Sequence, residues 1–233
     1  MKKHIIALAL ITIVATAVLA FIFLRFSFLP LPASTQAHTI DKLFSAMFAI
    51  AGFFLVLCLV ALVYSAIVFR RRRGDTSDGP AIQGNNALEA TWILIPLAIV
   101  IGLGVVGGIT LTSISAAPDE PELEVKVTAF QWAWLFEYPE QGVTSGELRL
   151  PEGKPVLLHL TARDVIHSFW VPEFRVKMDA VPGMETELRV TPDLLGDYQL
   201  LCAEMCGLGH AYMRAPVKVV SQDEFEAWVR SLK

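Results

Sequence analysis

Cysteine is scarce in this chain, with 3 in 233 residues. So few thiols build no disulfide framework, which excludes the small disulfide-stapled folds. Charge is scarce as well, because Asp, Glu, Lys and Arg make up 18% of the residues against 54% hydrophobic ones. A mean hydropathy of +0.53 excludes an ordinary soluble domain.

Charged side chains are absent altogether from two long stretches, residues 43–69 and 90–118. Each stretch exceeds the roughly 20 apolar residues that cross a bilayer as a helix. We therefore expect transmembrane spans at about 43–69 and 91–116. Cys58 lies in the first of them and is expected to be a small buried hydrophobe.

Four consecutive arginines, Arg70–Arg73, follow the first span. Positive charge gathers on the cytoplasmic side of membrane proteins, so the 70–90 loop is predicted to be cytoplasmic. The two spans then form a hairpin within a domain at 38–118, and a second domain at 119–233 lies on the periplasmic or outer face. The chain is thus expected to be a multi-pass protein of the inner (plasma) membrane.

A third apolar run covers residues 5–24, after Lys2 and Lys3. The apolar core of a signal peptide usually has about 7–15 residues, fewer than this run. Residues 1–37 are expected to be a signal peptide or an additional transmembrane anchor, and the length of the run favours a retained third span.

The charges that are present divide by sign. Residues 1–116 carry 8 Lys/Arg and 4 Asp/Glu, a net of +4, and residues 117–233 carry 11 and 19, a net of −8. An acidic water-facing domain attracts basic partners over a long range. The same charge argues against a nucleic acid partner.

Short alternating apolar segments, separated by proline and glycine, characterise residues 119–233. This texture predicts a small all-β sandwich or barrel. The expected strands are 124–128, 155–161, 187–191, 198–201 and 216–220. After them, Ser221 and Glu224 form a capping-box pattern that predicts a C-terminal amphipathic helix. Its apolar face is expected to be Phe225, Trp228, Val229 and Leu232.

Five potential metal ligands stand out in the outer domain. Cys202, Cys206, His210 and Met213 fall within twelve residues, and His167 lies 35 residues before Cys202. Thiolates and thioethers are soft ligands that suit copper, whereas a structural zinc site does not normally use methionine. A blue-copper site has one cysteine, so two thiolates that can bridge favour a two-copper centre. A Cys202–Cys206 disulfide is the alternative, but it leaves His210 and Met213 unexplained.

These segments, together with Gln131–Trp134 and Glu89–Trp92, resemble subunit II of haem-copper respiratory oxidases, the copper-bearing subunit of cytochrome c oxidase, over about residues 38–220. The resemblance implies a membrane α plus all-β fold: a transmembrane hairpin followed by a cupredoxin-like Greek-key sandwich. It also implies a binuclear copper centre whose ligands are bridging Cys202 and Cys206, His167 and His210 on one copper each, weakly bound Met213, and the carbonyl of Glu204.

Three side chains acquire further roles from the resemblance. The Glu204 carboxylate points to a magnesium or manganese ion shared with the catalytic subunit, although it could simply bond backbone amides of its loop. Trp132 would lie exposed above the copper site as the point where electrons enter, with Trp134 structural. As a strand, however, 130–138 places Trp132, Trp134, Phe136 and Tyr138 on one face, which most often means core.

Glu89 opens the second span, three residues before Trp92. By resemblance it is the entrance of a proton channel into the catalytic subunit, since an interfacial carboxylate can exchange protons with water. The alternative is an ordinary interfacial carboxylate that ends a loop.

The function implied is that of an oxidase subunit, with the oxygen chemistry and the haem in a partner. Subunits I and III and cytochrome c are the expected partners, with proton translocation coupled to oxygen reduction. Two alternatives stay open: the copper subunit of a nitric oxide reductase, and a membrane-anchored copper carrier or metal-delivery protein. A quinol oxidase is disfavoured, because its subunit II lacks the copper ligands.

Overall fold

A computed structural model describes residues 2–26, 28–79 and 81–233. Met1, Ser27 and Pro80, which fall in the predicted N-terminal segment and the 70–90 loop, lie outside the described residues. The contacts divide the chain into two units. The first, here called the helical unit, comprises residues up to 29 and 43–109, and the second, the outer unit, comprises 30–42 and 110–233.

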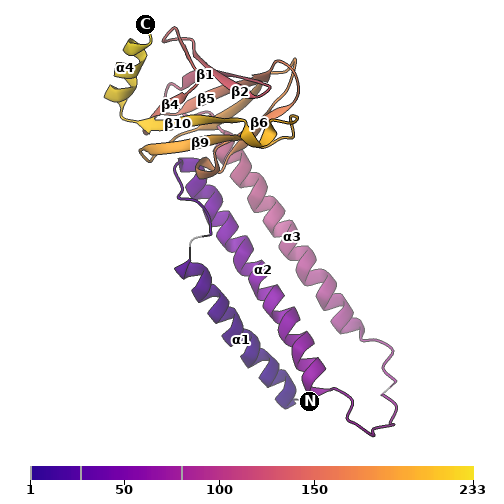
Figure 1. Cartoon of the computed structure of the whole chain (residues 1–233). Helices are drawn as coiled ribbons and strands as arrows, with labels where there is room; N and C mark the ends of the chain where they lie inside the picture. Colours follow the sequence, from indigo (N-terminus) through magenta and orange to yellow (C-terminus); the bar gives the residue numbers. More distant parts are fainter. Residues whose placement is uncertain (1, 27, 80) are drawn as a thin grey trace. The chain divides into compact units, whose positions relative to one another are not determined.

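Three helices are long and apolar enough to cross a membrane: α1 (Lys2–Arg25), α2 (Thr35–Val68) and α3 (Asn86–Ser115) (Figure 1). Both predicted spans are therefore helical, and the N-terminal run forms a third helix. α2 begins eight residues before the expected span at 43, and its first turns belong to the outer unit.

Within the helical unit, α1 packs along α2. Nδ1 of His4 lies 2.8 Å from the hydroxyl of Tyr64, and Leu19 fits against Gly52, where an added Cβ would come within 3.2 Å of it. Small residues and polar pairs of this kind hold helices together in membranes, where apolar burial alone supplies no drive. Cys58 is exposed on the surface of α2, a helix apolar enough to cross a membrane, so it is not packed in the protein interior as expected.

The outer unit contains two five-stranded sheets (Figure 1). The first has the order β3-β2-β1-β5-β8 and the second β4-β10-β9-β6-β7. The strands are β1 (Leu123–Phe130), β2 (Ala133–Tyr138), β3 (Val143–Ser145), β4 (Leu148–Pro151), β5 (Val156–Ala162), β6 (His167–Trp170), β7 (Lys177–Ala180), β8 (Thr186–Val190), β9 (Gly196–Cys202) and β10 (Arg214–Val220). Most pairings are antiparallel, but β1–β5 and β4–β10 are parallel.

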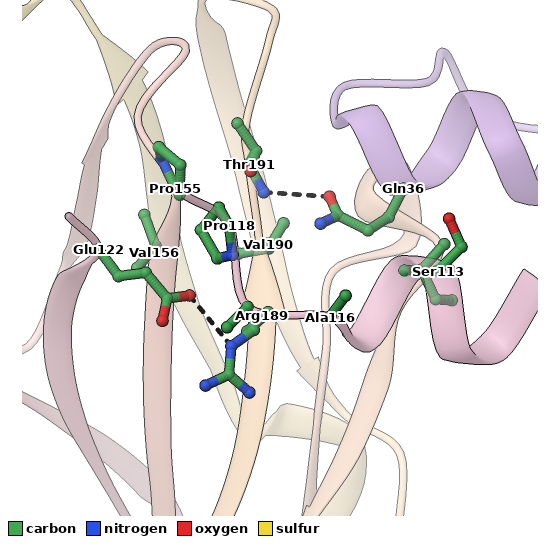
Figure 2. A pocket seen from close by; sticks show the side chains of 12 residues that line it. Gln36, Ser113, Ala116, Pro118, Glu122, Pro155, Val156, Arg189, Val190 and Thr191 are labelled. Carbon is green, nitrogen blue, oxygen red and sulfur yellow. Dashed lines mark hydrogen bonds and ion pairs between the residues drawn. The ribbon is translucent and has the colours of Figure 1, made fainter. Parts of the chain in front are cut away.

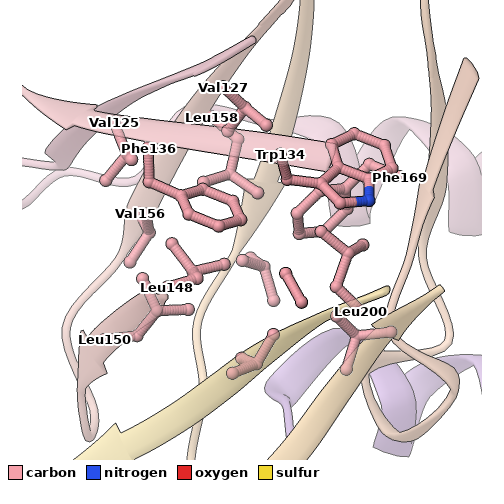
Figure 3. Packing of buried hydrophobic residues seen from close by; sticks show 14 of the residues in the cluster. Val125, Val127, Trp134, Phe136, Leu148, Leu150, Val156, Leu158, Phe169 and Leu200 are labelled. Carbon is pink, nitrogen blue, oxygen red and sulfur yellow. The ribbon is translucent and has the colours of Figure 1, made fainter. Parts of the chain in front are cut away.

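One hydrophobic cluster joins the inner faces of the two sheets (Figure 3). Alternation places every second residue of β1 in this cluster, because successive side chains of a strand point to opposite faces. From the first sheet come Phe136 and Leu158, and from the second come Phe169 and Leu200, all without solvent exposure. The predicted β-sandwich is therefore confirmed, and all five expected strands exist.

The structure also contains strands that the alternation pattern does not single out. β6 has only four residues, His167–Trp170, of which the first three are all buried. β7 pairs with it, and β9 pairs with its other side. A strand this short, with three consecutive buried residues, shows no alternation of apolar and polar residues from which it could be predicted.

The C-terminal helix α4 (Gln222–Ser231) begins as predicted. Ser221 accepts a hydrogen bond from the N–H of Glu224, and the Glu224 side chain accepts from the N–H of Ser221. Phe225 and Trp228 are buried against Tyr138. Leu232 lies beyond the last turn and is 43% exposed, so this part of the expected apolar face is wrong.

Residues 30–42 are built into the outer unit. Ser34 is fully buried, its hydroxyl donates to the carbonyl of Phe174, and its neighbour Ala33 bonds the backbone of Glu173 and Asp193. Figure 2 shows Gln36 accepting a hydrogen bond from the N–H of Thr191, beside a pocket of about 250 Å³. The segment after α1 is thus part of the folded outer unit.

Candidate metal centre

The thiol of Cys206 lies at the centre of the predicted donor set. Its Sγ is 3.7 Å from Sγ of Cys202, 3.7 Å from Nδ1 of His210 and 3.7 Å from Sδ of Met213. Nδ1 of His167 lies 3.9 Å from Sγ of Cys202. The carbonyl oxygen of Glu204 lies 3.3 Å from the same sulfur, so all six predicted donors converge.

Three segments of the second sheet bring these donors together. His167 opens β6, Cys202 closes β9, and Met213 stands just before β10. The backbone ties them, because the Cys202 N–H donates to the carbonyl of Met213 at 3.1 Å and the Ala203 N–H donates to that of Ser168 at 3.0 Å. His210 begins the short helix η2 (His210–Tyr212) that closes the loop.

Burial makes this site poorly solvated. His167 and Met213 are 0% exposed and Cys206 is 2% exposed. Burial, helped by the neighbouring Cys202 thiol, raises the pKa of the Cys206 thiol to about 11. At neutral pH the metal-free thiol therefore keeps its proton, and a metal that binds there must displace it.

Both cysteines of the loop are free. Their sulfur–sulfur distance of 3.7 Å is far longer than the roughly 2.05 Å of a disulfide bond. The donor set, two thiols, two imidazoles, a thioether and a carbonyl, fits soft and borderline metals such as copper.

Asp164 orients the first histidine. Its Oδ1 lies 2.8 Å from Nε2 of His167, and its Oδ2 accepts the backbone N–H of Gln131 at 2.7 Å. Burial works to raise the pKa of this carboxyl, but hydrogen bonds from His167, Gln131 and Val165 together hold the pKa below its usual value. The ionised carboxylate accepts the Nε2 proton, which leaves Nδ1 free to face the sulfur cluster.

Comparison with known proteins identifies the family. The family model described as cytochrome C oxidase subunit II, periplasmic domain, matches residues 141–220, and the one described as its transmembrane domain matches 24–107. The chain is 38% identical to cytochrome c oxidase subunit 2 of Thermostichus vulcanus, over 87% of this chain and 77% of that protein.

The chain belongs to the cytochrome c oxidase subunit II family. A quinol oxidase subunit 2 of Bacillus spizizenii is 33% identical, over 77% of this chain and 59% of that one. A crystal structure of the periplasmic domain of subunit II of Bradyrhizobium japonicum cytochrome oxidase is 30% identical, covers 50% of this chain and 96% of its own, and has a TM-score of 0.48.

Members of this family are subunits of haem-copper terminal oxidases, which are oxidoreductases. The resemblance read from the ligand loop is therefore confirmed. The three long apolar helices and the transmembrane family domain make the chain a membrane protein. Periplasmic orientation of the outer unit is implied by the family domain that matches it.

Trp132 lies outside β2, which begins one residue later. Its side chain is 43% exposed and its Nε1 donates to the carbonyl of Cys206 at 3.3 Å. Trp134 is 3% exposed and meets the rings of His167 and Phe169 edge-on. Figure 3 shows Trp134 beside Phe169. Trp132 is thus exposed beside the metal loop and Trp134 is buried, as the resemblance implied. The alternative, in which Trp132 shares a buried strand face with Trp134, is wrong, because the strand starts after Trp132.

The other predicted site residues lie as follows. Glu204 is exposed on the metal loop, and in the described part of the chain its carboxylate accepts no hydrogen bond from a backbone amide. Glu89 is exposed in the first turn of α3, where its Oε1 accepts the N–H of Asn85 at 3.3 Å. Asn85 itself caps the helix by accepting from Ala87 and Leu88, so Glu89 has a structural contact.

Sequence analysis assigned no role to Asp164 or Gln131. Asp164 stands three residues before His167, and Gln131 donates through Nε2 to the carbonyl of Cys206 at 2.8 Å. A carboxylate close to a predicted metal-binding histidine is a usable signal, because such histidines commonly bond one. The Gln131 contact spans 75 residues and leaves no local trace.

Proposed function

We propose that this chain is the electron-accepting subunit of a cytochrome c oxidase. It would take electrons from cytochrome c at a two-copper centre and deliver them to haem and copper in subunit I, where oxygen is reduced to water and protons are translocated. The observation that carries the proposal is the convergence of six donors around two free, buried thiols. The alternatives, a nitric oxide reductase subunit or a free copper carrier, have less support, since the relatives named above are oxidase subunits.

The ligands would be shared between two copper ions. When bound, copper would supply a one-electron redox couple. Cys202 and Cys206 would bridge both ions after losing their protons, and His167 and His210 would each bind one through Nδ1. Met213 would be a weak ligand that tunes the potential, and the Glu204 carbonyl would complete the set.

The rigid sheet supports this role. The donors are fixed by backbone hydrogen bonds between β6, β9 and the residue before β10. A frame that barely moves between oxidation states lowers the reorganisation that accompanies electron transfer. Asp164 would keep the imidazole of His167 in one tautomer and orientation.

Trp132 would receive the electron from the donor protein. Its indole is partly exposed and bonded to the carbonyl of Cys206, so it joins the surface to the metal loop. The net charge of −8 on residues 117–233 suits a basic cytochrome c.

Two carboxylates would serve partner-dependent roles. The exposed side chain of Glu204 would bind a magnesium or manganese ion shared with subunit I. Glu89, near the cytoplasmic end of α3, would feed protons into a channel of subunit I. The assembled enzyme would also contain subunit III and sit in the inner (plasma) membrane. The predicted domain at 119–233 would lie on its periplasmic face, with residues 1–37 as an additional anchor before the hairpin at 38–118.

Metal content tests the copper assignment. The purified full chain should bind two coppers, and electron paramagnetic resonance should show one unpaired electron shared by both. Cys202→Ser and Cys206→Ser should each abolish the signal, since each thiolate is needed as a bridge. Cys58→Ser, on α2, is the matched control and should bind normally. One copper per chain, or zinc, would overturn the two-copper assignment.

The electron-accepting role of Trp132 has its own test. Trp132→Ala in the assembled oxidase should slow reduction by cytochrome c many-fold while two coppers remain bound. Trp134→Phe is a poor control, because Trp134 packs on His167. Trp170→Ala is the control instead, because Trp170 is an exposed tryptophan on β6. Unchanged reduction in Trp132→Ala would rule the residue out.

A further inference from the structure

Gly209 lies directly against the indole ring of Trp132. A Cβ added at Gly209 would come within 2.4 Å of Cδ2 and 2.6 Å of Cγ of the indole, distances that no real side chain tolerates. The backbone itself does not require glycine, because Gly209 has φ −88° and ψ 5°, a conformation with negative φ that is open to residues with side chains. A side chain is therefore excluded at this position by the closeness of the Trp132 ring, and not by the backbone conformation of Gly209.

Two hydrogen bonds hold the aromatic segment on the metal loop at this point. Nε2 of Gln131 and Nε1 of Trp132 both donate to the carbonyl of Cys206, at 2.8 and 3.3 Å. A carbonyl oxygen has two lone pairs and can accept both. The indole thus bonds a residue whose own sulfur lies at the centre of the donor set.

The ring cannot avoid a side chain at Gly209 by a small rotation. The atoms that would be struck, Cγ and Cδ2, belong to the part of the indole nearest its own backbone. Moving them displaces the whole ring, and the hydrogen bond to Cys206, already 3.3 Å long, is lost.

We propose that Gly209 is a positioning residue: its lack of a side chain lets the Trp132 indole lie against the metal loop, in contact with Cys206, and so sets the rate of electron uptake. The inference rests on the proposed function, in which Trp132 receives electrons. Electron transfer slows steeply as the gap between the partners widens. Gly209→Ala should therefore act on the rate of transfer within the docked complex, and not on docking.

The position of the ring can be measured without any metal. In the copper-free full-length chain labelled with ¹⁵N-tryptophan, five indole N–H signals are expected from the five tryptophans. Trp132→Phe identifies the signal of Trp132. In Gly209→Ala that signal should move and exchange faster with water, because its hydrogen bond is gone, while the Trp134 and Trp228 signals stay in place.

The rate is measured in the assembled oxidase at saturating reduced cytochrome c. Gly209→Ala should lower the limiting rate of reduction by on the order of tenfold or more, the size expected for a misplaced reacting group, with the cytochrome affinity unchanged. Gly146→Ala is the matched control, since Gly146 is exposed and an added Cβ meets no atom within 4 Å. It should change neither the signals nor the rate.

The outcomes separate the inference from the proposed function. An unmoved Trp132 signal in Gly209→Ala would overturn the inference, whatever the variant does to copper binding. A displaced ring with an unchanged limiting rate would also overturn it. If Trp132→Ala likewise left the rate unchanged, the electron-accepting role of Trp132 would fall with it; if Trp132→Ala slowed the reaction, only the role of Gly209 would be lost.

Discussion

Asp164 joins His167, three residues away in the sequence, to Gln131, which lies 33 residues away. One carboxylate oxygen accepts the ring of His167 and the other accepts the backbone N–H of Gln131, whose side chain in turn bonds the carbonyl of Cys206. A single carboxylate thus fixes both a proposed ligand and the segment that carries Trp132. Partners of this kind are nearly as important to a metal site as the ligands themselves.

Removing this carboxylate should weaken the copper site. We expect Asp164→Ala to lower copper affinity by about 10- to 100-fold, because the His167 ring loses the acceptor that fixes its orientation. Competition with a chelator of known affinity measures the change. Asp197→Ala is the control: it removes the same charge, but from a carboxylate that is 81% exposed and lies at the end of β9 far from the donors. The copper affinity of this variant should equal that of the native protein. Equal affinities in both variants would leave Asp164 without a role at the metal.

At the scale of secondary-structure elements, the start of α3 combines a cap with a proposed proton donor. Glu89 accepts the N–H of Asn85, while Asn85 accepts from the first turn. Such a reciprocal arrangement stabilises a helix start. A change at Glu89 can therefore disturb the helix as well as proton uptake, and the test has to separate the two.

Replacing Glu89 with glutamine separates the effect on the helix from the effect on proton uptake. Glu89→Gln keeps an oxygen that accepts the Asn85 N–H but cannot release a proton. If Glu89 feeds protons, both Glu89→Gln and Glu89→Ala should lower steady-state oxidase turnover, while copper reduction by cytochrome c stays fast. Glu89→Asp should retain part of the activity. Normal turnover in Glu89→Gln over a range of pH, with a loss only in Glu89→Ala, would assign the residue to the cap alone.

The N-terminal helix α1 offers a second prediction at this scale. The chain after α1 continues into residues of the outer unit. Ala33 and Ser34 are 0% exposed and are hydrogen-bonded to loops of that unit, and Arg175 donates to the carbonyl of Pro30. His4 also contacts Tyr64 of α2. We expect the purified subunit to retain α1, so its intact mass should include residues 5–24. A mass that begins between 30 and 38 would show that the run is removed as a signal peptide.

At the scale of the whole molecule, the distribution of charge should control encounter with the donor. The net charge of −8 on residues 117–233 would attract the proposed donor, a basic cytochrome c, and salt would screen that attraction over about 8–10 Å at physiological ionic strength. The second-order rate of reduction should therefore fall steeply as ionic strength rises. Reduction by a small uncharged reductant, measured alongside, should be insensitive to salt.

Two aspartates of the outer unit can test where the attraction acts. Asp179 is exposed on β7 and pairs with Ser168, the residue that follows His167 on β6. Asp197 is exposed at the other end of β9. Asp179→Asn should lower the encounter rate at low salt more than Asp197→Asn. Equal effects would mean that only the total charge matters.

The sequence by itself determined the elements whose signals are local. Uncharged runs long enough to cross a bilayer predicted the helices, since a spanning helix needs about 20 apolar residues. Alternation fixed five strands, and the Ser221–Glu224 pattern fixed the start of α4. The donor set could be read from Cys202 to Met213 with His167, because the preference of copper for soft ligands depends on residue type and not on the fold.

Tertiary structure alone decided what depends on distant contacts. Alternation left a buried strand face open as an alternative for Trp132, but β2 begins at Ala133, and the indole bonds Cys206 across 74 residues. The burial of Ser34 and the short strand β6 likewise follow from neighbours far along the chain. Gly209 makes the same point, because nothing in its own φ and ψ calls for glycine, and only the ring brought against it by the fold explains why no side chain fits.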